Sequence, residues 1–219
     1  MLDYAKTMKY RSGENPALWK GHLDNVFSKP SKIHEVEHFA AMPFKQVPKY
    51  FRGLKEKDSV AALALRFLIL TAARSGESRG ATWDEIDLNN KVWVIPKERM
   101  KAKKDHRVPL TKEALAVLDT AKKHKVDEQE WVFPGMRGKS CVTEAAIRKL
   151  MKDTGVTMHG FRSSFRDWAA ELTNFPRHIA EACLAHTIDT NVEKAYRRGD
   201  LLKKRRQLMT DWELFLLKK

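Results

Sequence analysis

Two separated segments carry cationic residues that suit chemistry on a phosphodiester. Arg74 follows a long apolar run and precedes a Ser-Gly pair, with Glu77 three residues on as a partner for its guanidinium. In the segment MHGFRSSFRDW, His159 and Arg162 are spaced i and i+3, which brings them to one face of a helix. An imidazole and a guanidinium together can hold one phosphate. For each segment alone, a solvated cation at a helix end or a chance pairing is the competing interpretation.

A tyrosine in a strongly basic context is the candidate nucleophile. Tyr196 lies ten residues after His186, which follows an apolar helix-like run, and it directly precedes Arg197 and Arg198. A phenol with a pKa of about 10 is a poor nucleophile unless nearby cations stabilise the developing anion. The two arginines meet that need. A half-buried aromatic residue without a chemical role is the interpretation that Tyr196 alone would favour.

The segment KERMKAKKDHR supplies candidate proton donors. It covers residues 97–107 and holds six basic and two acidic residues, a net charge of 6 − 2 = +4. Most lysines in a turn are solvated and meet phosphates only as point charges. One of Lys101, Lys103 and Lys104 could instead donate a proton.

A rival motif is the HExxH pattern that runs from His34 to His38. In zinc peptidases this pattern lies on a helix within a folded cleft and has a third ligand downstream. Here it lies in a polar connector after Pro30, and the glycine of the longer form of the motif is replaced by Ala41. A chance match on a surface helix is therefore the favoured interpretation.

The composition favours a folded protein with a polyanionic partner. Of 219 residues 42% are apolar, and the net charge is 42 − 28 = +14, with a sequence pI of about 9.8. This excess of positive charge points first to nucleic acid. The longest apolar run, residues 60–73, is interrupted by Arg66 and is shorter than the roughly 20 residues that cross a bilayer. Cys141 and Cys183 lack metal-ligand spacing and no signal-peptide pattern is present, so we expect a cytosolic chain without disulfides or a cysteine-based zinc site.

Hydrophobic periodicity predicts a compact, mostly helical unit from residue 43 onward. An apolar helix is expected from Asp58, as its N-cap, to Thr71, and the glycine-punctuated corner RSGESRG is expected to end it. The alternating segments 91–95 and 107–110 predict a hairpin. Further helices are expected over 111–123, 143–152, 159–172, 176–185 and 200–217, and a short one over 2–10.

Six residues appear in the order and approximate spacing of the tyrosine recombinases, the phage-type integrases: Arg74, Lys101, His159, Arg162, His186 and Tyr196. LTAARSGESRGATWDEID resembles the family's first arginine box, IPKERMKAKKDHRVPL its β-hairpin lysine segment, and HGFRSSFRDWAAE with LAHTIDTNVEKAYRRGD its second box. The similarity runs from about residue 43 to the C-terminus and is greatest to integrases of satellite phages and genomic islands. It implies an α+β, mainly helical fold, the tyrosine recombinase catalytic domain with a small antiparallel β-sheet or hairpin.

The resemblance implies a site-specific recombinase that cleaves and rejoins DNA through a 3′-phosphotyrosyl intermediate. Tyr196 is then the nucleophile, and Arg74 and Arg162 stabilise charge on the nonbridging oxygens of the phosphate with a hydrogen bond from His186. Lys101 is the implied general acid for the leaving 5′ oxygen. Neither a cofactor nor a divalent metal is required.

The remaining site residues have supporting roles in this scheme. His159 assists proton transfer at the tyrosine or orients the phosphate, and Glu77 gives structural support. Lys103 and Lys104 compete with Lys101 for the role of general acid. Contacts to DNA are expected from Lys103, Lys104, Arg197 and Arg198.

The family comparison also implies how the chain is divided and what it meets. Residues 1–30 resemble the last part of a core-binding domain with its linker, and residues 31–219 the catalytic domain, so we expect a fragment of a longer integrase. Expected partners are double-stranded DNA attachment sites, other protomers in a tetrameric synapse, excisionase and DNA-bending host proteins, but no membrane. The expected location is the cytoplasm, at the nucleoid through DNA.

Two alternatives to this function and two packing modes for the last helix stay open. The alternatives are an enzyme like the type IB topoisomerases and a noncatalytic basic DNA-binding protein. Asp200 can cap the last helix, whose apolar residues recur at helical spacing: Leu201, Leu202, Leu208, Met209, Trp212, Phe215 and Leu216. Packing on its own domain is favoured, and docking on a neighbouring protomer, as in related recombinases, is the other mode.

Overall fold

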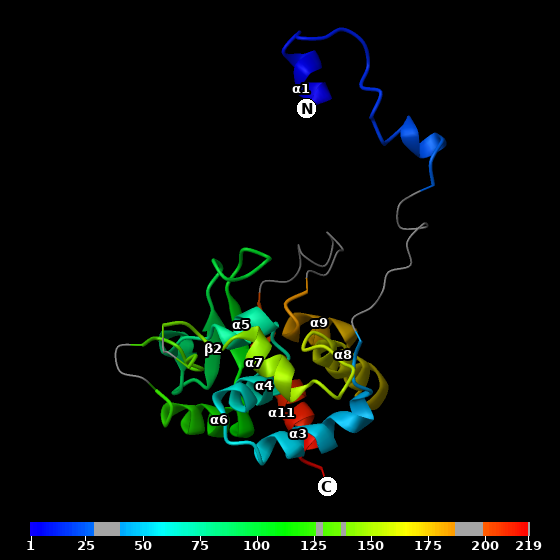
Figure 1. Ribbon diagram of the computed structural model, residues 1–219. Helices are drawn as coiled ribbons and strands as arrows, with labels where there is room; N and C mark the ends of the chain where they lie inside the picture. The colour runs from blue at the N-terminus through cyan, green and yellow to red at the C-terminus, as the bar shows by residue number, and fades with distance from the viewer. Residues whose placement is uncertain (29–39, 126–128, 137–138, 187–198, 219) are drawn as a thin grey trace. The chain divides into compact units, whose positions relative to one another are not determined.

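The chain divides into two units. The computed structural model describes residues 1–28, 40–125, 129–136, 139–186 and 199–218. The first unit, Met1–His38, contains helix α1 (Leu2–Thr7) and a 3-10 helix at Leu23–Asn25, and the second unit is Phe39–Lys219 (Figure 1). The assignment of residues 1–30 to a core-binding domain stays a prediction.

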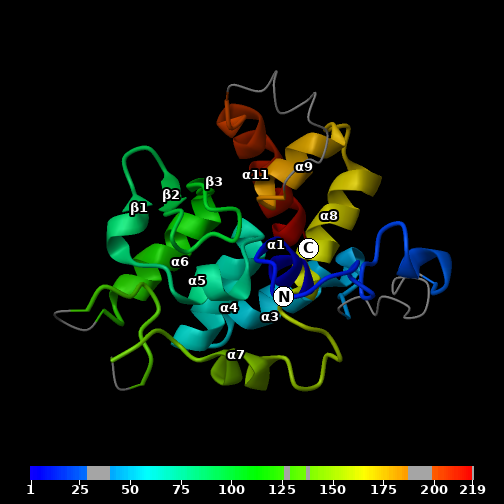
Figure 2. The same cartoon turned by 90° about the horizontal axis from the view of Figure 1, so that it is seen from above.

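The second unit is mainly helical and carries one small sheet (Figures 1 and 2). Its helices are α3 (Val47–Lys55), α4 (Val60–Thr71), α5 (Ser75–Arg79), α6 (Lys112–Lys122), α7 (Glu144–Leu150), α8 (Gly160–Leu172), α9 (Arg177–Cys183) and α11 (Leu202–Leu217), with 3-10 helices at Phe44–Gln46 and Trp83–Glu85. The strands β1 (Ile86–Asp87), β2 (Val92–Ile95) and β3 (His106–Pro109) pair antiparallel in the order β1-β2-β3, with Trp93 opposite both Ile86 and Val108. The helices and the hairpin expected between residues 58 and 217 are confirmed, with ends shifted by one or two residues.

Helix α4 is the centre of the core because it is apolar on nearly every side. Every residue from 62 to 71 is buried, and α3, α5, α6, α7 and α11 all contact this helix. Arg66, which interrupts the apolar run, is also buried and donates to Glu113 of α6 at 2.8 Å. The predicted N-cap is wrong by one residue: Ser59 has the extended backbone of a cap, and its hydroxyl accepts from the Ala62 amide at 3.2 Å.

Three local features differ from the expectation. The corner RSGESRG forms the short helix α5, because Ser78 packs inward and its hydroxyl donates to the Ala64 carbonyl of α4. Strand β1 adds a two-residue edge to the expected hairpin. Helix α3 begins with Pro48 in its first turn, where a missing amide proton costs nothing, and it buries Phe51 and Leu54.

Helix α11 packs into its own domain. Trp212 is fully buried and its indole donates to the Ile69 carbonyl of α4 at 2.8 Å, while Leu208, Met209 and Leu216 are also buried. The favoured expectation of packing in cis is therefore confirmed. Leu201, in a left-handed conformation, is the cap residue, whereas the predicted cap Asp200 accepts the Leu202 amide at 3.2 Å.

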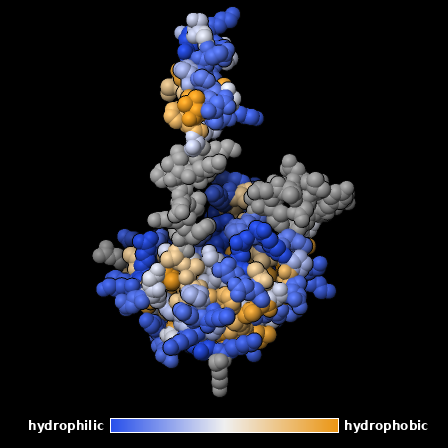
Figure 3. All heavy atoms as spheres, turned by 90° about the vertical axis from the view of Figure 1, so that its right-hand side faces the viewer, coloured by the Kyte–Doolittle hydropathy of each residue, from blue (hydrophilic) through white to orange (hydrophobic). Residues whose placement is uncertain are grey.

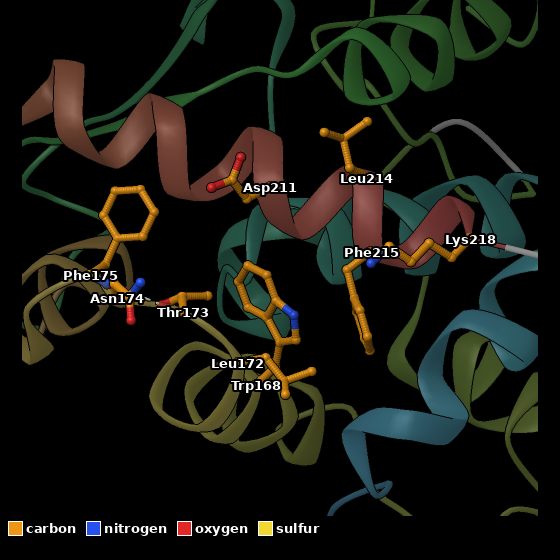
Figure 4. A pocket seen from close by; sticks show the side chains of 9 residues that line it. All are labelled: Trp168, Leu172, Thr173, Asn174, Phe175, Asp211, Leu214, Phe215 and Lys218. Carbon is orange, nitrogen blue, oxygen red and sulfur yellow. Dashed lines mark hydrogen bonds between the residues drawn. The ribbon is translucent and has the colours of Figure 1, made fainter.

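Aromatic side chains join α11 to α8. Trp168 of α8 lies 4.9 Å from Trp212 and 5.8 Å from Phe215 between ring centroids. Trp168 and Phe215 line a pocket of about 570 Å³ together with residues that include Leu172 and Phe175 (Figure 4). Hydrophilic residues cover most of the face of the second unit seen in Figure 3.

Candidate active site

The turn between α4 and α5 presents Arg74. Ala72 has a positive φ of 50°, which ends α4, and Arg74 follows in extended conformation as the cap of α5. The Glu77 carboxylate accepts the Arg74 backbone amide at 2.9 Å and its Nη1 at 2.7 Å. The Glu77 side chain is 6% exposed and that of Arg74 is 27% exposed. One edge of the Arg74 guanidinium is thus fixed while part of the group stays accessible.

Arg162 lies in the first turn of α8 and is only 3% exposed. Its Nη1 donates to the Ala72 carbonyl at 2.6 Å and its Nη2 to the Leu184 carbonyl at 2.7 Å. These carbonyls end α4 and α9, where aligned peptide dipoles leave partial negative charge. Burial, followed by the charge of Arg74, lowers the pKa of Arg162 to about 10, so it is still a cation at neutral pH.

His186 is turned toward Arg162 by the end of α9. Ala185 has a φ of 51°, and the His186 amide donates to the Glu181 carbonyl at 3.0 Å. The imidazole Nδ1 is 2.6 Å from Glu181 Oε2, and Nε2 is 3.2 Å from Arg162 Nη2. With 42% of its side chain exposed, His186 borders both the buried arginine and solvent.

Glu181 connects His186 to two more arginines. Its Oε1 accepts from Arg166 Nε at 2.9 Å and from Arg177 Nε at 3.3 Å. Burial alone would raise the pKa of Glu181, but the hydrogen bonds from His186 and Arg166 outweigh it and the pKa is lowered. A charged Glu181 holds a proton on Nδ1 of His186 and fixes the orientation of the ring.

His159 is the N-cap residue of α8 and is exposed. Partial burial and then the charges of Arg162 and Arg74 lower its pKa, which puts the imidazole within the field of both cations. The start of α8 is tightly packed, because a Cβ on Gly160 would lie 2.3 Å from the Ala40 carbonyl oxygen. A cavity of about 470 Å³ adjoins this point, lined by His159 and by residues that include Arg148 and Lys152.

The hairpin lysines lie on the turn between β2 and β3. Lys101, Lys103 and Lys104 are all exposed, and Lys103 has a positive φ of 52°. Figure 1 shows the turn rising from the sheet on the side of the unit where α5 lies. The structure thus leaves these ammonium groups accessible.

Several predicted residues lie outside the described part of the chain. They are Tyr196, Arg197 and Arg198, which fall between His186 and α11, and the HExxH histidines His34 and His38. The described residues contain no group of three or more histidine, cysteine, aspartate or glutamate side chains that could hold a metal ion. No described helix combines the length and apolarity that a membrane crossing needs.

Four of the predicted residues are brought together, and two of their neighbours were missed from sequence. Arg74, Arg162, His159 and His186 share one electrostatic environment, with Glu77 as a partner of Arg74. Glu181 and Arg99 were not predicted: Glu181 binds His186, and Arg99 donates to the carbonyl of Glu77 at 2.6 Å. A lone acid within the apolar run IAEACLA was the available signal for Glu181.

The arrangement suits stabilisation of a phosphoryl group in transfer. Two guanidinium groups and two imidazoles come from three separate parts of the chain: the α4–α5 turn, the start of α8 and the end of α9. Fixed cations lower the energy of a transition state whose nonbridging oxygens gain charge, since little reorganisation is then needed.

Comparisons with known protein sequences identify one family. The sequence profile of the phage integrase family matches residues 41–201. Prophage integrase IntA of Escherichia coli K12 is 31% identical over 198 residues, which cover 87% of this chain and 46% of that protein. The integrase of enterobacteria phage P4 is 29% identical over 204 residues, covering 83% of this chain and 46% of that protein. The chain spans about half the length of the curated relatives it matches.

Solved structures share the fold at low sequence identity. The lambda integrase tetramer bound to a Holliday junction matches with a TM-score of 0.57 at 15% identity, over 88% of this chain and 55% of that one. The Tn1549 transposon integrase in complex with circular intermediate DNA matches with a TM-score of 0.56 at 13% identity, over 90% of this chain and 75% of that one. The predicted fold, a tyrosine recombinase catalytic domain with a small antiparallel sheet, is confirmed. The family match covers most of the chain, and the chain therefore belongs to the phage integrase family.

Proposed function

We propose that this chain cleaves and rejoins DNA strands in site-specific recombination, integrating or excising a mobile element. The observation that carries the proposal is the convergence of Arg74, Arg162, His159 and His186, with Arg162 held by neutral carbonyls. Arg162 donates to carbonyls rather than to a carboxylate, and a scissile phosphate would supply the negative charge that its guanidinium lacks as a direct partner. The integrases among its relatives support the same function.

The reaction needs a nucleophile and an acid besides these cations. Tyr196 Oη attacks phosphorus and forms a 3′-phosphotyrosyl bond, its proton leaves to solvent or a neighbouring base, and the bond to the 5′ oxygen breaks. Lys101 gives a proton to that 5′ oxygen, which departs as a hydroxyl. Attack by a 5′ hydroxyl of another strand reverses the sequence, so the bond energy is kept in the phosphotyrosine.

The cations divide the work on the phosphate. Arg74, with its accessible edge, and Arg162 offer guanidinium donors to the nonbridging oxygens, which gain charge in the transition state. His186 joins them at the phosphate, with its ring oriented by the contact between Nδ1 and the Glu181 carboxylate. His159, at the edge of this field, orients the phosphate or assists proton transfer at the tyrosine.

Partners follow from the charge and from what relatives bind. A net charge of +14 and the cavity lined by Arg148 and Lys152 favour double-stranded DNA attachment sites as the substrate, with backbone contacts from Lys103, Lys104, Arg197 and Arg198. Lambda integrase is a tetramer on its Holliday junction, which supports a synapse of protomers here. Excisionase and DNA-bending host proteins complete the proposal, with residues 1–30 as part of a core-binding domain and the nucleoid as the place of action.

A covalent adduct tests the proposal. The chain is incubated with a nicked duplex attachment site that loses the short strand after cleavage, and the adduct is isolated and digested to locate the modified peptide. We expect the 3′ phosphate on Tyr196, no adduct with Tyr196→Phe although that variant still binds DNA, and full activity with EDTA. Binding without any adduct would contradict the enzyme and favour a noncatalytic DNA-binding protein. Relaxation of plasmid supercoils without strand exchange would favour a topoisomerase.

A further inference from the structure

A buried ion pair lies at the foot of the β2–β3 turn. Glu85, at the end of the 3-10 helix Trp83–Glu85, is 8% exposed, and its Oε2 accepts the Trp93 indole at 2.9 Å. Both of its carboxylate oxygens also accept Arg99 Nη1. Arg99 therefore joins the turn to the buried side of the sheet.

The second nitrogen of the same guanidinium reaches helix α5. Arg99 Nη2 donates to the Glu77 carbonyl at 2.6 Å and lies 3.4 Å from the Gly76 carbonyl. A Cβ on Gly80 would lie 3.1 Å from Nη2, so the glycine gives the arginine room along α5. Glu77 is thus held at its backbone by Arg99 and at its carboxylate by Arg74.

The contacts of Arg99 fix the base of the lysine turn. The next residue, Met100, is 2% exposed and anchors the chain in the core, and Lys101 follows it into solvent. At the other side of the turn, Asp105 accepts the Lys97 amide at 2.8 Å. Lys101 therefore lies two residues after Arg99, whose guanidinium is bound to the helix that carries Glu77.

We propose that Arg99 is a positioning residue that fixes the position of Lys101 relative to Arg74. The inference rests on the proposed function, because it takes Lys101 as the acid and Arg74 as a phosphate ligand. A planar guanidinium can bind the Glu85 carboxylate and the Glu77 carbonyl at once, whereas an ammonium group is a single point charge on a flexible stem. Proton donation needs the ammonium within hydrogen-bond reach of the leaving oxygen, and a misplacement of about 1 Å can cost about 100-fold in rate.

Cleavage of two DNA substrates tests the role. One nicked duplex has the natural bridging 5′ oxygen, and the other has sulfur there, a leaving group that departs without protonation. With Arg99→Lys and Arg99→Met we expect a loss of about 100-fold on the oxygen substrate and a loss at least tenfold smaller on the sulfur substrate. Lys101→Ala should give the same pattern. Equal losses on both substrates would overturn the proposal.

The matched control is Arg79→Met. Arg79, on α5, is half-buried like Arg99, but it donates to the Val142 carbonyl at 2.8 Å and not to the turn. Any loss in this variant should be equal on the two substrates. If sulfur rescues Arg79→Met as well as Arg99→Met, rescue is a general effect of a weakened α5 and the proposal fails.

A measurement without DNA separates this inference from the proposed function. Amide hydrogen exchange in Arg99→Met should accelerate at least tenfold over residues 97–104 and stay unchanged in α4. Arg99→Met leaves the buried carboxylate of Glu85 without its partner, which could unfold the domain. The double variant Glu85→Gln with Arg99→Met removes that carboxylate, and its exchange over residues 97–104 should accelerate as in the single variant. Unchanged exchange in the turn would contradict positioning by Arg99, while faster exchange in a chain that never cleaves DNA would contradict only the proposed function.

Discussion

Arg74 and Arg162 face the same site from two regions that are built differently. Arg74 begins the short helix α5, pairs with the Glu77 carboxylate and keeps 27% of its side chain exposed. Arg162 is 3% exposed and binds carbonyls at the ends of two helices that are far apart in sequence. One arginine is attached to the fold by its own turn, whereas the other holds parts of the fold together.

Because of this difference, the two arginines should contribute differently to the stability of the fold. The carbonyls of Ala72 and Leu184 would be left without their charged donor if Arg162 were removed. Removal of Arg74 leaves Glu77 with the backbone amide of residue 74 as a donor. We therefore expect the same truncation to have two effects at Arg162 and mainly one at Arg74.

The largest effect is expected for Arg162→Ala. Loss of two charge-assisted hydrogen bonds should lower the free energy of unfolding by about 3 kcal/mol. Loss of a transition-state donor should slow cleavage by about 100-fold to 1000-fold in the molecules that stay folded. Urea unfolding and single-turnover cleavage at a temperature below the transition measure the two quantities. A variant of normal stability would show that Arg162 is not the brace that its contacts indicate.

Arg74→Ala should show the catalytic loss with little structural loss. We expect cleavage to fall by about 100-fold to 1000-fold, while the free energy of unfolding falls by about 1 kcal/mol, since the pair with Glu77 is partly exposed. The same two assays give the comparison with Arg162→Ala. A stability loss as large as that of Arg162→Ala would erase the distinction between the two regions.

Acid should lower the free energy of unfolding through His106, the first residue of β3. Burial and then the charge of Arg205 lower the pKa of His106 to about 4, so its folded form is neutral. The unfolded chain, with a histidine pKa of about 6.5, binds more protons between pH 6.5 and 4, and stability falls as the pH falls through that window. The loss is about 3 kcal/mol in total, and it should be much reduced in His106→Gln, as unfolding curves across this range would show. Equal slopes for the two proteins would rule out His106 as the cause.

The smallest effect is expected at two alanines. Ala72 and Ala185 end α4 and α9 with φ values of 50° and 51°, which a side chain makes unfavourable. Ala72→Gly and Ala185→Gly should each raise the free energy of unfolding by up to about 1 kcal/mol, measured by urea unfolding. Ala180→Gly, within α9, is the opposite control and should destabilise by a similar amount. Destabilisation at 72 or 185 would mean that the alanine methyl groups contribute more packing than strain.

The sequence predicted the helices and strands better than it predicted the contacts between them. The long apolar run of α4 and the alternation of β2 are strong sequence signals, so the positions of these two elements were predictable to within one or two residues. The two-residue strand β1 and the five-residue helix α5 are too short to have a period, and only their tertiary contacts stabilise them. The choice between Asp58 and Ser59 as cap depended on backbone conformation, which two adjacent good cap residues do not reveal.

In the site, too, the sequence predicted residues better than their contacts. Arg74, Arg162 and His186 stood out by residue type and order, and their family spacing gave them roles. Their partners did not, because the Arg162 carbonyl acceptors are 90 and 22 residues away and become neighbours only in the fold. Arg99 was one of six basic residues in its segment and differed from the others only in the contacts that the fold gives it.

Arg74 and Arg162 are proposed to act on the charge of one scissile phosphate. Cleavage of a nicked duplex tests this role when a methyl group replaces one nonbridging oxygen of that phosphate and removes its negative charge. If the arginines stabilise that charge, the rate penalties of Arg74→Ala and Arg162→Ala should each shrink at least tenfold on the neutral substrate. Penalties as large on the neutral phosphate as on the natural one would show that the two arginines do not act on that charge.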